Sequence, residues 1–389
     1  PTADAATADT FAASDAGLGT PLRGRYAGRP GAITLRGSGG PLAWTTSVAT
    51  TPEAGSVWVF TTTDITSPIE WKPLLGDTEW ARGPNYHVAP GDTIEVEPHF
   101  VAGAGRVVEL LPAFSSAFVT GPRIVWAYLP PGYDENTAAR WPVVYMQDGQ
   151  NLFDPARAFG GNEWEADETM SAAAETGHCG DPAGAACAND GECGAGARCD
   201  TFHGAILVAP EASPARIAEY TPTVDPVDGG GSADAYLRAL TEELAPTVVA
   251  MLRTRTEREH TGILGSSLGG LLAAHASVVH ADVFGLVGAM SPSTWWDGRV
   301  ILDEVATIPS RPARALRVYV DSGNAGTASD GFADTADLAA AYAAAGYVEG
   351  SSLRYVLAPG HQHNEVYWAM RLPGALSYLL GPREEPVVP

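Results

Sequence analysis

The chain has 389 residues, of which 46 are acidic and 23 basic, so its formal net charge at pH 7 is -23. Such an excess of carboxylates repels phosphate groups, which excludes nucleic acid and anionic lipid as expected partners. Hydrophobic residues make up 45% of the chain and charged residues 18%, as in soluble globular proteins. No apolar run reaches the ~18 residues of a membrane span.

Residues 1–17 contain mainly Ala, Thr, Asp and Ser, a composition that favours a disordered tether over a folded segment. The chain begins at Pro1, so we expect that an export signal or a lipid anchor preceded this residue. The last residues, 384–389, are expected to form a short tail. A secreted, cell-surface or periplasmic location follows from these expectations.

Residues 18–112 contain short alternating runs rich in Thr, Val and Trp, which are typical of an antiparallel, Ig-like β-sandwich. Within them, residues 70–91 resemble starch-binding-type modules, in which a Trp and a Lys precede a second Trp and a Gly-Pro-Asn turn. The resemblance implies a carbohydrate-binding-module-like domain. Packing in the core of the sandwich is the favoured interpretation for Trp71 and Trp80, and stacking on sugar rings is the alternative.

From residue 113 to 383 the pattern changes to continuous apolar runs that alternate with Ala-rich amphipathic segments. Continuous hydrophobicity indicates strands buried on both faces, which predicts an α/β fold with a mostly parallel sheet flanked by helices. Helices are expected over 233–255 and 335–347. The expected strands cover residues 123–130, 141–149, 204–210, 260–265, 284–291, 315–323 and 353–360. Ligands of such sheets bind at the carboxyl ends of the strands.

All four cysteines fall in one segment, 178–200, which has too few apolar residues to fold by burial alone. Two disulfides are expected, with three connectivities that the sequence does not separate. A zinc site is the alternative, but no CxxC pair is present, and the acidic residues of the segment lack the spacing of a calcium loop. The residues concerned are Cys179, Cys187, Cys193 and Cys199, with Asp190, Glu192 and Asp200 as the acidic neighbours.

The stretch GSSLG places Ser267 in a G-x-S-x-G motif with Gly265 and Gly269, between an expected strand and an expected helix. This context predicts a sharp turn that lifts one serine above the sheet, and the register selects Ser267 as the nucleophile. A serine needs a base that a third group orients. His361 and His363 follow the last strand, where the base belongs. A metal held by this H-x-H pair is the alternative, but no third ligand is evident.

Several motifs of residues 120–383 resemble the Putative esterase family of the α/β-hydrolase superfamily. This group includes esterase D-like enzymes, enterochelin esterases, feruloyl esterases and antigen 85 mycolyltransferases. The motifs are YMQDGQNLFD (145–154), RIAEYTP (216–222), GILGSSLGGL (262–271), MSPSTWW (290–296) and HNEVYWAMRLPGAL (363–376). The cysteine-rich insertion departs from most of the family.

The resemblance implies roles for individual residues. His363, before Asn-Glu, corresponds to the catalytic base, and the backbone N–H groups of Leu268 and Gln150 to the oxyanion hole. Asp330 matches the family's acid, which follows a Gly-Asn turn after a strand, and Asp321 at the end of that strand is the alternative.

Other residues have weaker functional interpretations. Trp164, Trp295, Trp296 and His361 are candidates for lining a substrate pocket, and core packing is the alternative for the tryptophans. Arg216 and Glu219 are expected to pair with each other and hold their loop, and contact with the substrate is the alternative.

These features predict a secreted serine carboxylic ester hydrolase that uses an acyl-enzyme and no cofactor. Its expected substrates are small aryl or acyl esters or esterified polysaccharide. An acyltransferase to sugars with the same triad is one alternative, and a non-catalytic carbohydrate-binding surface protein is the other. The sequence does not predict the oligomeric state.

Overall fold

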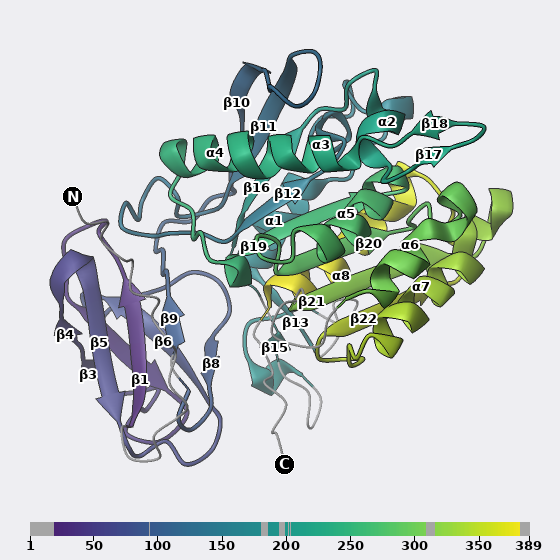
Figure 1. Ribbon diagram of the computed structural model, residues 1–389. Coiled ribbons are helices and arrows are strands. Elements are labelled where there is room, and N and C mark those ends of the chain that lie inside the picture. The colour runs from purple at the N-terminus through teal and green to yellow at the C-terminus, as the bar shows by residue number, and fades with distance from the viewer. Residues whose placement is uncertain are drawn as a thin grey trace, which may run out of the picture. The chain divides into compact units, whose positions relative to one another are not determined.

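In the computed structural model, the chain forms two compact units (Figure 1). The first consists of residues 1–81, 85–100 and 135–138, and the second of 82–84, 101–134 and 139–389. The residues that the structure describes are 19–92, 94–179, 186–193, 199–200, 202, 204–308 and 316–381. The predicted tether and tail therefore lie outside the described residues.

Residues 101–112 belong to the second unit, which differs from the predicted domain boundary at 112. The reason is strand β10 (Arg106–Phe114), which pairs antiparallel with β11 (Arg123–Leu129) at the edge of the large sheet of the second unit. Residues of β10 are partly or fully exposed. An edge strand of this kind has the same alternating pattern as the strands that precede it, so the sequence alone did not separate them.

The first unit is built from two β-sheets that share one hydrophobic core. Burial alternates along the strands, and Leu22 and Leu35, one from each sheet, are fully buried. One sheet has the order β4 (Thr51–Pro52), β5 (Val57–Thr62), β1 (Thr20–Arg25), β9 (Ile94–Val96). The other has the order β3 (Val48–Ala49), β2 (Ile33–Gly37), β6 (Ile69–Leu75), β7 (Glu79–Trp80), and β8 (Tyr86–Val88) also pairs with β6.

The two tryptophans considered for sugar stacking have different environments. Trp71 has 0% exposure and lies edge-to-face against Trp58, with ring centroids 6.3 Å apart. Trp71 therefore packs in the core of the unit, which confirms the favoured interpretation for this residue and removes it as a candidate for sugar stacking. Trp80 is 38% exposed and lies beside Trp44, with ring centroids 6.0 Å apart.

The second unit contains an eight-stranded sheet, and this confirms the predicted α/β fold with a mostly parallel sheet (Figure 1). Strand β11 runs antiparallel to both of its neighbours, β10 and β16, and the six strands from β16 onward run parallel to one another. The order is β10, β11, β16 (Ile206–Pro210), β12 (Val143–Met146), β19 (Thr261–Ser266), β20 (Leu286–Met290), β21 (Arg317–Gly323) and β22 (Leu353–Ala358).

Helices cover both faces of this sheet. Alternate residues of β12 belong to different cores: Tyr145 packs in one and Val144 in the other. The core around Val144 contains residues of α1 (Ala166–Glu175) and α8 (Glu365–Leu380). The core around Tyr145 contains residues of α3 (Ala233–Arg238), α5 (Leu268–Val279), α6 (Trp296–Ala306) and α7 (Phe332–Ala344). The remaining helices are α2 (Arg216–Tyr220) and α4 (Ala245–Met251), and the π-helical segment Ala239–Leu244 joins α3 to α4.

In the part of the chain that the structure describes, no helix combines the length and the apolar character that crossing a bilayer requires.

The cysteine-rich segment forms a small three-stranded sheet, with strands β13 (Gly177–Cys179), β14 (Ala186–Cys187) and β15 (Cys199–Asp200). Cys187 is bonded to Cys199, and Cys193 is also in a disulfide. The side chain of Cys179 lies outside the described residues.

Buried His275 connects helix α5 to two neighbouring helices. Its Nδ1 lies 2.6 Å from a Glu304 carboxylate oxygen on α6, and its Nε2 lies 2.9 Å from Asp234 on α3. Burial lowers the pKa of His275, but the hydrogen bonds and charges of the two carboxylates outweigh burial and raise it above 6.5. Both nitrogens therefore donate, and the ring is an imidazolium clamped between two acids.

We expect this clamp to make stability depend on pH. Because the pKa of His275 is raised in the folded state, its contribution is complete below the unfolded value of 6.5 and is lost as pH rises through the folded value. Urea unfolding between pH 6 and 9 tests this. The parent should lose stability over that range, and His275→Gln should be less stable at pH 6 by about 1.5–3 kcal/mol, with a smaller decline. Parallel declines in the two proteins would contradict this role.

Candidate active site

Ser267 occupies the turn between β19 and α5, with φ 56° and ψ -122°, a backbone conformation that a non-glycine residue rarely adopts. A Cβ atom on Gly265 would lie 2.7 Å from the carbonyl carbon and oxygen of Gly269, so glycine is required where the two backbones cross. Ser266, by contrast, ends β19 and is 3% exposed. The geometry therefore presents Ser267 and buries its neighbour, as the motif register predicts.

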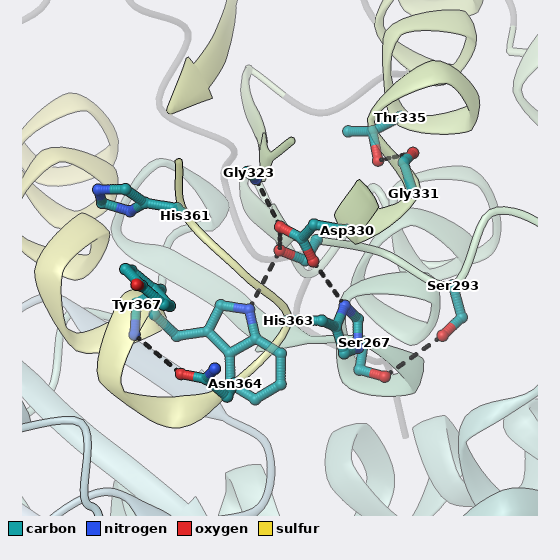
Figure 2. A network of polar contacts seen from close by, with 12 residues as sticks. Ser267, Ser293, Gly323, Asp330, Gly331, Thr335, His361, His363, Asn364 and Tyr367 are labelled. Carbon is teal, nitrogen blue, oxygen red and sulfur yellow. Dashed lines mark hydrogen bonds and ion pairs between the residues drawn. The ribbon is translucent and has the colours of Figure 1, made fainter. Parts of the chain in front are cut away.

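Asp330 lies after β21 in a short irregular helix, Thr327–Gly331, in which Ala328, Ser329 and Asp330 all have positive φ. The residue is 3% exposed, and its Oδ1 lies 2.7 Å from His363 Nδ1 (Figure 2). Its Oδ2 accepts hydrogen bonds from the Ser291 hydroxyl and the Gly323 N–H. Burial raises the pKa of Asp330, but these hydrogen bonds outweigh it and lower the pKa, so the group is a carboxylate at neutral pH.

His363 lies in the loop before α8, and Figure 2 shows its ring between Asp330 and the side chain of Ser267. Trp368 packs edge-on against this ring, with centroids 5.0 Å apart. Because Nδ1 is bonded to a carboxylate, it carries the proton, which leaves Nε2 as the acceptor that a serine hydroxyl requires. The structure thus brings together Ser267, Asp330 and His363, each following a parallel strand of the same sheet.

The alternative acid, Asp321, has other partners. It is fully buried at 0% exposure, accepts a hydrogen bond from the Tyr319 hydroxyl at 3.0 Å, and lies 3.1 Å from Nε of Arg371. Burial raises the pKa of Asp321, and the opposing effects of Arg371, Tyr319 and the Ser291 N–H reduce this rise without cancelling it. Its carboxylate is committed to these groups, and the ring of His363 is bonded to Asp330 instead.

Both residues predicted for the oxyanion hole lie next to the nucleophile's strand. Leu268 begins α5, where the first N–H groups of a helix have no partner within the helix. Gln150 lies in the turn Gly149–Asn151, which follows β12, and β12 pairs with β19. The side-chain oxygen of Gln150 accepts a hydrogen bond from the Ala212 N–H at 2.9 Å, which holds this turn against the loop after β16.

The residues predicted to line a pocket differ in exposure. Trp295 is 50% exposed and follows β20, so it is available to a substrate. Trp164 and Trp296 are each 1% exposed and belong to the two cores, which corrects their assignment to a pocket. His361 stacks on Tyr367 and places Nδ1 3.5 Å from Arg371, so it does not pair with His363 as a metal ligand.

The predicted pair between Arg216 and Glu219 is wrong, because each side chain has a different partner. Arg216 forms two hydrogen bonds with Asp148, at 2.6 and 2.7 Å, and Asp148 directly precedes the oxyanion turn. Glu219 forms a buried pair with Arg123, at 2.8 and 2.9 Å. Charge spacing along the chain did not reveal partners that are 68 and 96 residues away.

Sequence reasoning missed four residues around the triad. Ser293 lies next to the nucleophile, with its Oγ 3.4 Å from Ser267 Oγ. Ser291, Trp368 and Arg371 form a buried cluster behind Asp330. The helical i, i+3 spacing of Trp368 and Arg371, directly after the base, was the signal that could have identified two of them.

Three carboxylates form the one acidic group in the described residues of the second unit whose ligand atoms all lie within 4.8 Å: Glu163, Asp167 and Glu168. Burial, with the neighbouring acids, raises the pKa of Glu163 to about 7 and that of Asp167 to about 6. These raised pKa values favour the protonated forms of Glu163 and Asp167 near neutral pH, which reduces the repulsion among the three carboxyl groups.

Comparison with known proteins identifies the family. The model of the family described as Putative esterase matches residues 116–379. The uncharacterized protein YbbA of Bacillus subtilis (strain 168) is 25% identical over 210 residues, which cover 52% of this chain and 69% of the relative. A siderophore enterobactin esterase of Emericella nidulans is 35% identical over 104 residues, which cover 24% of this chain and 34% of that relative.

Among solved structures, the enterobactin esterase FES from Shigella flexneri has a similar fold, with a TM-score of 0.50 and 15% sequence identity over 92% of each chain. A likeness at this identity concerns the fold alone. The family match extends over both the nucleophile turn and the histidine loop. The chain therefore belongs to the Putative esterase family and is a carboxylic ester hydrolase.

Proposed function

We propose that this protein is an exported serine esterase that hydrolyses its substrate through an acyl-enzyme. The observation that carries the proposal is the alignment of three groups: the strained turn at Ser267, the ring of His363, and the 2.7 Å contact between that ring and Asp330. This geometry activates a hydroxyl that is otherwise a weak nucleophile at neutral pH.

In the first step, His363 Nε2 takes the proton of Ser267 as its oxygen attacks the ester carbonyl. Asp330 stabilises the imidazolium that forms, and the N–H groups of Leu268 and Gln150 are assigned to the oxyanion. The tetrahedral intermediate collapses as His363 donates its proton to the departing alcohol. Water then attacks the acyl-enzyme in the reverse sequence of proton transfers and releases the carboxylic acid.

The proposed substrates are small aryl or acyl esters or the ester groups of polysaccharides. Trp295 supports an aryl or acyl contact, because it is half-exposed and lies two residues after Ser293, which touches the nucleophile. The disulfide between Cys187 and Cys199 supports export, because such bonds persist in oxidising compartments.

Hydrolysis of p-nitrophenyl esters from acetate to long acyl chains, and of methyl ferulate, tests the proposal. We expect turnover with a preference that reports the size of the acyl site. Adding a sugar alcohol as acceptor separates hydrolysis from acyl transfer: hydrolysis yields free acid as the main product, whereas a sugar ester as the main product would show a transferase. A folded protein that is silent on every ester would reject the proposal.

A second candidate function concerns the first unit, where Trp44 and Trp80 form an aromatic pair. Arg36 lies over the Trp80 ring at 5.3 Å, so the pair is held in place from one side. We propose that its exposed surface binds glycans by stacking on the apolar faces of sugar rings.

Affinity electrophoresis in gels containing soluble starch or xylan tests glycan binding. We expect retardation of the parent, and loss of most of it in Trp80→Ala, because stacking on one aromatic ring contributes about 1–3 kcal/mol by analogy with base stacking. Val101→Ala, which removes an exposed apolar side chain of the second unit, is the control for apolar surface outside the aromatic pair. Equal mobility of parent and Trp80→Ala would exclude this role.

A further inference from the structure

A buried serine lies directly behind the acid of the triad. Ser291 follows β20 with φ 37° and has 0% exposure. Its hydroxyl oxygen accepts hydrogen bonds from Arg371 Nη2 at 2.6 Å and from Trp368 Nε1 at 3.1 Å. A hydroxyl has two acceptor sites and one proton, and guanidinium and indole N–H groups only donate. The proton of Ser291 is therefore directed to its third neighbour, Asp330 Oδ2, at 2.8 Å.

This arrangement brings the positive charge of Arg371 close to Asp330, although Arg371 donates its hydrogen bond to Ser291 and not to Asp330. Arg371 Nη2 lies 3.7 Å from Asp330 Oδ2, and its hydrogen bond to Ser291 polarises the hydroxyl toward the same oxygen. The other oxygen of Asp330 faces His363. The carboxylate is thus shared between the base on one side and a cationic network on the other.

The charge of Arg371 is balanced by Asp321, the residue that the sequence offered as the alternative triad acid. Asp321 lies 3.1 Å from Arg371 Nε, and both side chains are at most 4% exposed. The hydroxyl of Tyr319 and the N–H of Ser291 also donate to Asp321, at 3.0 and 3.2 Å. A buried pair of this kind contributes little net stability, because desolvation offsets its attraction. Its position behind the triad points to a role in the reaction.

We propose that the Arg371–Asp321 ion pair, acting through Ser291, sets the effective charge of Asp330 and thereby the pH at which His363 becomes active as a base. Arg371, Asp321 and Ser291 are positioning residues, since none of them touches the reacting atoms. The inference rests on the proposed function, in which Asp330 and His363 serve the nucleophile. It assigns to Asp321 the role of counter-ion to Arg371.

Other titratable and charged groups surround this network. The pKa of His361 is lowered by burial and by Arg371, so its ring is neutral at pH 7. The pKa values of Tyr319, Tyr355 and Glu365 are raised, chiefly by burial, so both tyrosines are neutral in the range of interest. The titratable and charged groups that interact with Arg371, Asp321, Asp330 or His363 are Tyr319, Tyr355, Arg354, His361 and Glu365.

Two isosteric or near-isosteric changes should act in opposite directions. Asp321→Asn leaves the charge of Arg371 unbalanced, which disfavours the imidazolium and moves the acidic limb of the kcat/KM profile to lower pH. Arg371→Gln removes the nearby positive charge and moves that limb to higher pH. We expect displacements of about 0.5–1 pH unit, smaller than those of directly contacting charges. Arg371→Lys keeps the charge and should stay near the parent.

The experiment measures kcat/KM for p-nitrophenyl acetate between pH 4.5 and 9 in the parent and these variants. Values of KM should change little, and a purely structural role would lower activity without opposite displacements. Ser291→Ala introduces no lone buried charge, so it replaces Arg371→Gln if that variant does not fold, and it too should move the limb upward. The proposal would be overturned if Asp321→Asn and Arg371→Gln (or Ser291→Ala in its place) moved the acidic limb in the same direction. It would also be overturned if neither variant moved the limb.

A readout that needs no turnover separates this inference from the proposed function. The Cε1–H resonance of His363, assigned by its loss in His363→Gln, can be titrated by NMR in each variant. Opposite displacements of this titration support the ion-pair role even if the parent hydrolyses none of the esters, an outcome that would reject the proposed function alone. An active parent whose His363 titration is the same in all variants would reject the ion-pair role alone.

Discussion

Replacing Ser267 with alanine is expected to lower kcat for ester hydrolysis by about 10³–10⁶-fold, because the covalent step loses its nucleophile. The fold should be unaffected, since the one side-chain hydrogen bond of Ser267 within the described residues is the 3.4 Å interaction with Ser293. Steady-state kinetics on p-nitrophenyl acetate, with circular dichroism to verify folding, measure the effect. A fluorophosphonate probe should label the parent and leave Ser267→Ala unlabelled.

The matched control is Ser266→Ala, which removes the same hydroxyl one residue earlier. Ser266 ends β19 and is buried, so its loss should cost at most about 1 kcal/mol of stability and leave kcat within a few-fold of the parent. The pair of variants answers which of the two adjacent serines reacts. Activity that survives Ser267→Ala, or that disappears only in Ser266→Ala, would show that the nucleophile is assigned incorrectly.

Asp330→Asn is expected to lower kcat by about 10⁴-fold while KM changes little. The carboxylate accepts the Nδ1 proton of His363 at 2.7 Å, whereas an asparagine amide turned toward the ring can donate instead. The ring would then carry its proton on Nε2 and could no longer accept the proton of Ser267. Pre-steady-state acylation with p-nitrophenyl acetate measures the loss directly.

Asp321→Asn is the control for Asp330→Asn. It makes the same chemical change at Asp321, which ends β21, whereas Asp330 lies in the turn that follows this strand. Its carboxylate contacts Arg371 and Tyr319 and has no contact with the base. We expect kcat on the alkaline plateau within about tenfold of the parent, since the tautomer of His363 is unchanged. A larger loss in Asp321→Asn than in Asp330→Asn would exchange the roles of the two acids.

Features that depend on neighbouring residues in the chain were predictable. The nucleophile turn is local, because glycines four residues apart must allow two backbones to cross, as the 2.7 Å approach at Gly265 shows. The seven strands predicted for the α/β fold are all present. The five central strands, β16, β12, β19, β20 and β21, are buried along their whole length, which leaves a continuous apolar run in each. The eighth strand, β10, was missed because its residues are partly or fully exposed and Glu109 interrupts its apolar run.

Side-chain partners and burial were less predictable. A tryptophan in a β-strand has the same sequence pattern whether it faces the core or solvent, and Trp71 and Trp80 differ in this respect although both follow a turn-rich stretch. Arg216 and Glu219 lie on one short helix, yet their partners come from the loop after β12 and from β11. Such contacts depend on which distant elements pack together.

The sequence by itself determined the family and the α/β architecture, and it predicted the nucleophile and the base that we propose, because each rests on a motif or on local periodicity. Only the tertiary structure selected Asp330 over Asp321 and revealed the cluster of Ser291, Trp368 and Arg371. These groups come from β20, β21, an irregular turn and α8, which are up to 80 residues apart in the chain. They meet because parallel strands end at one edge of the sheet, and no spacing along the chain encodes that meeting point.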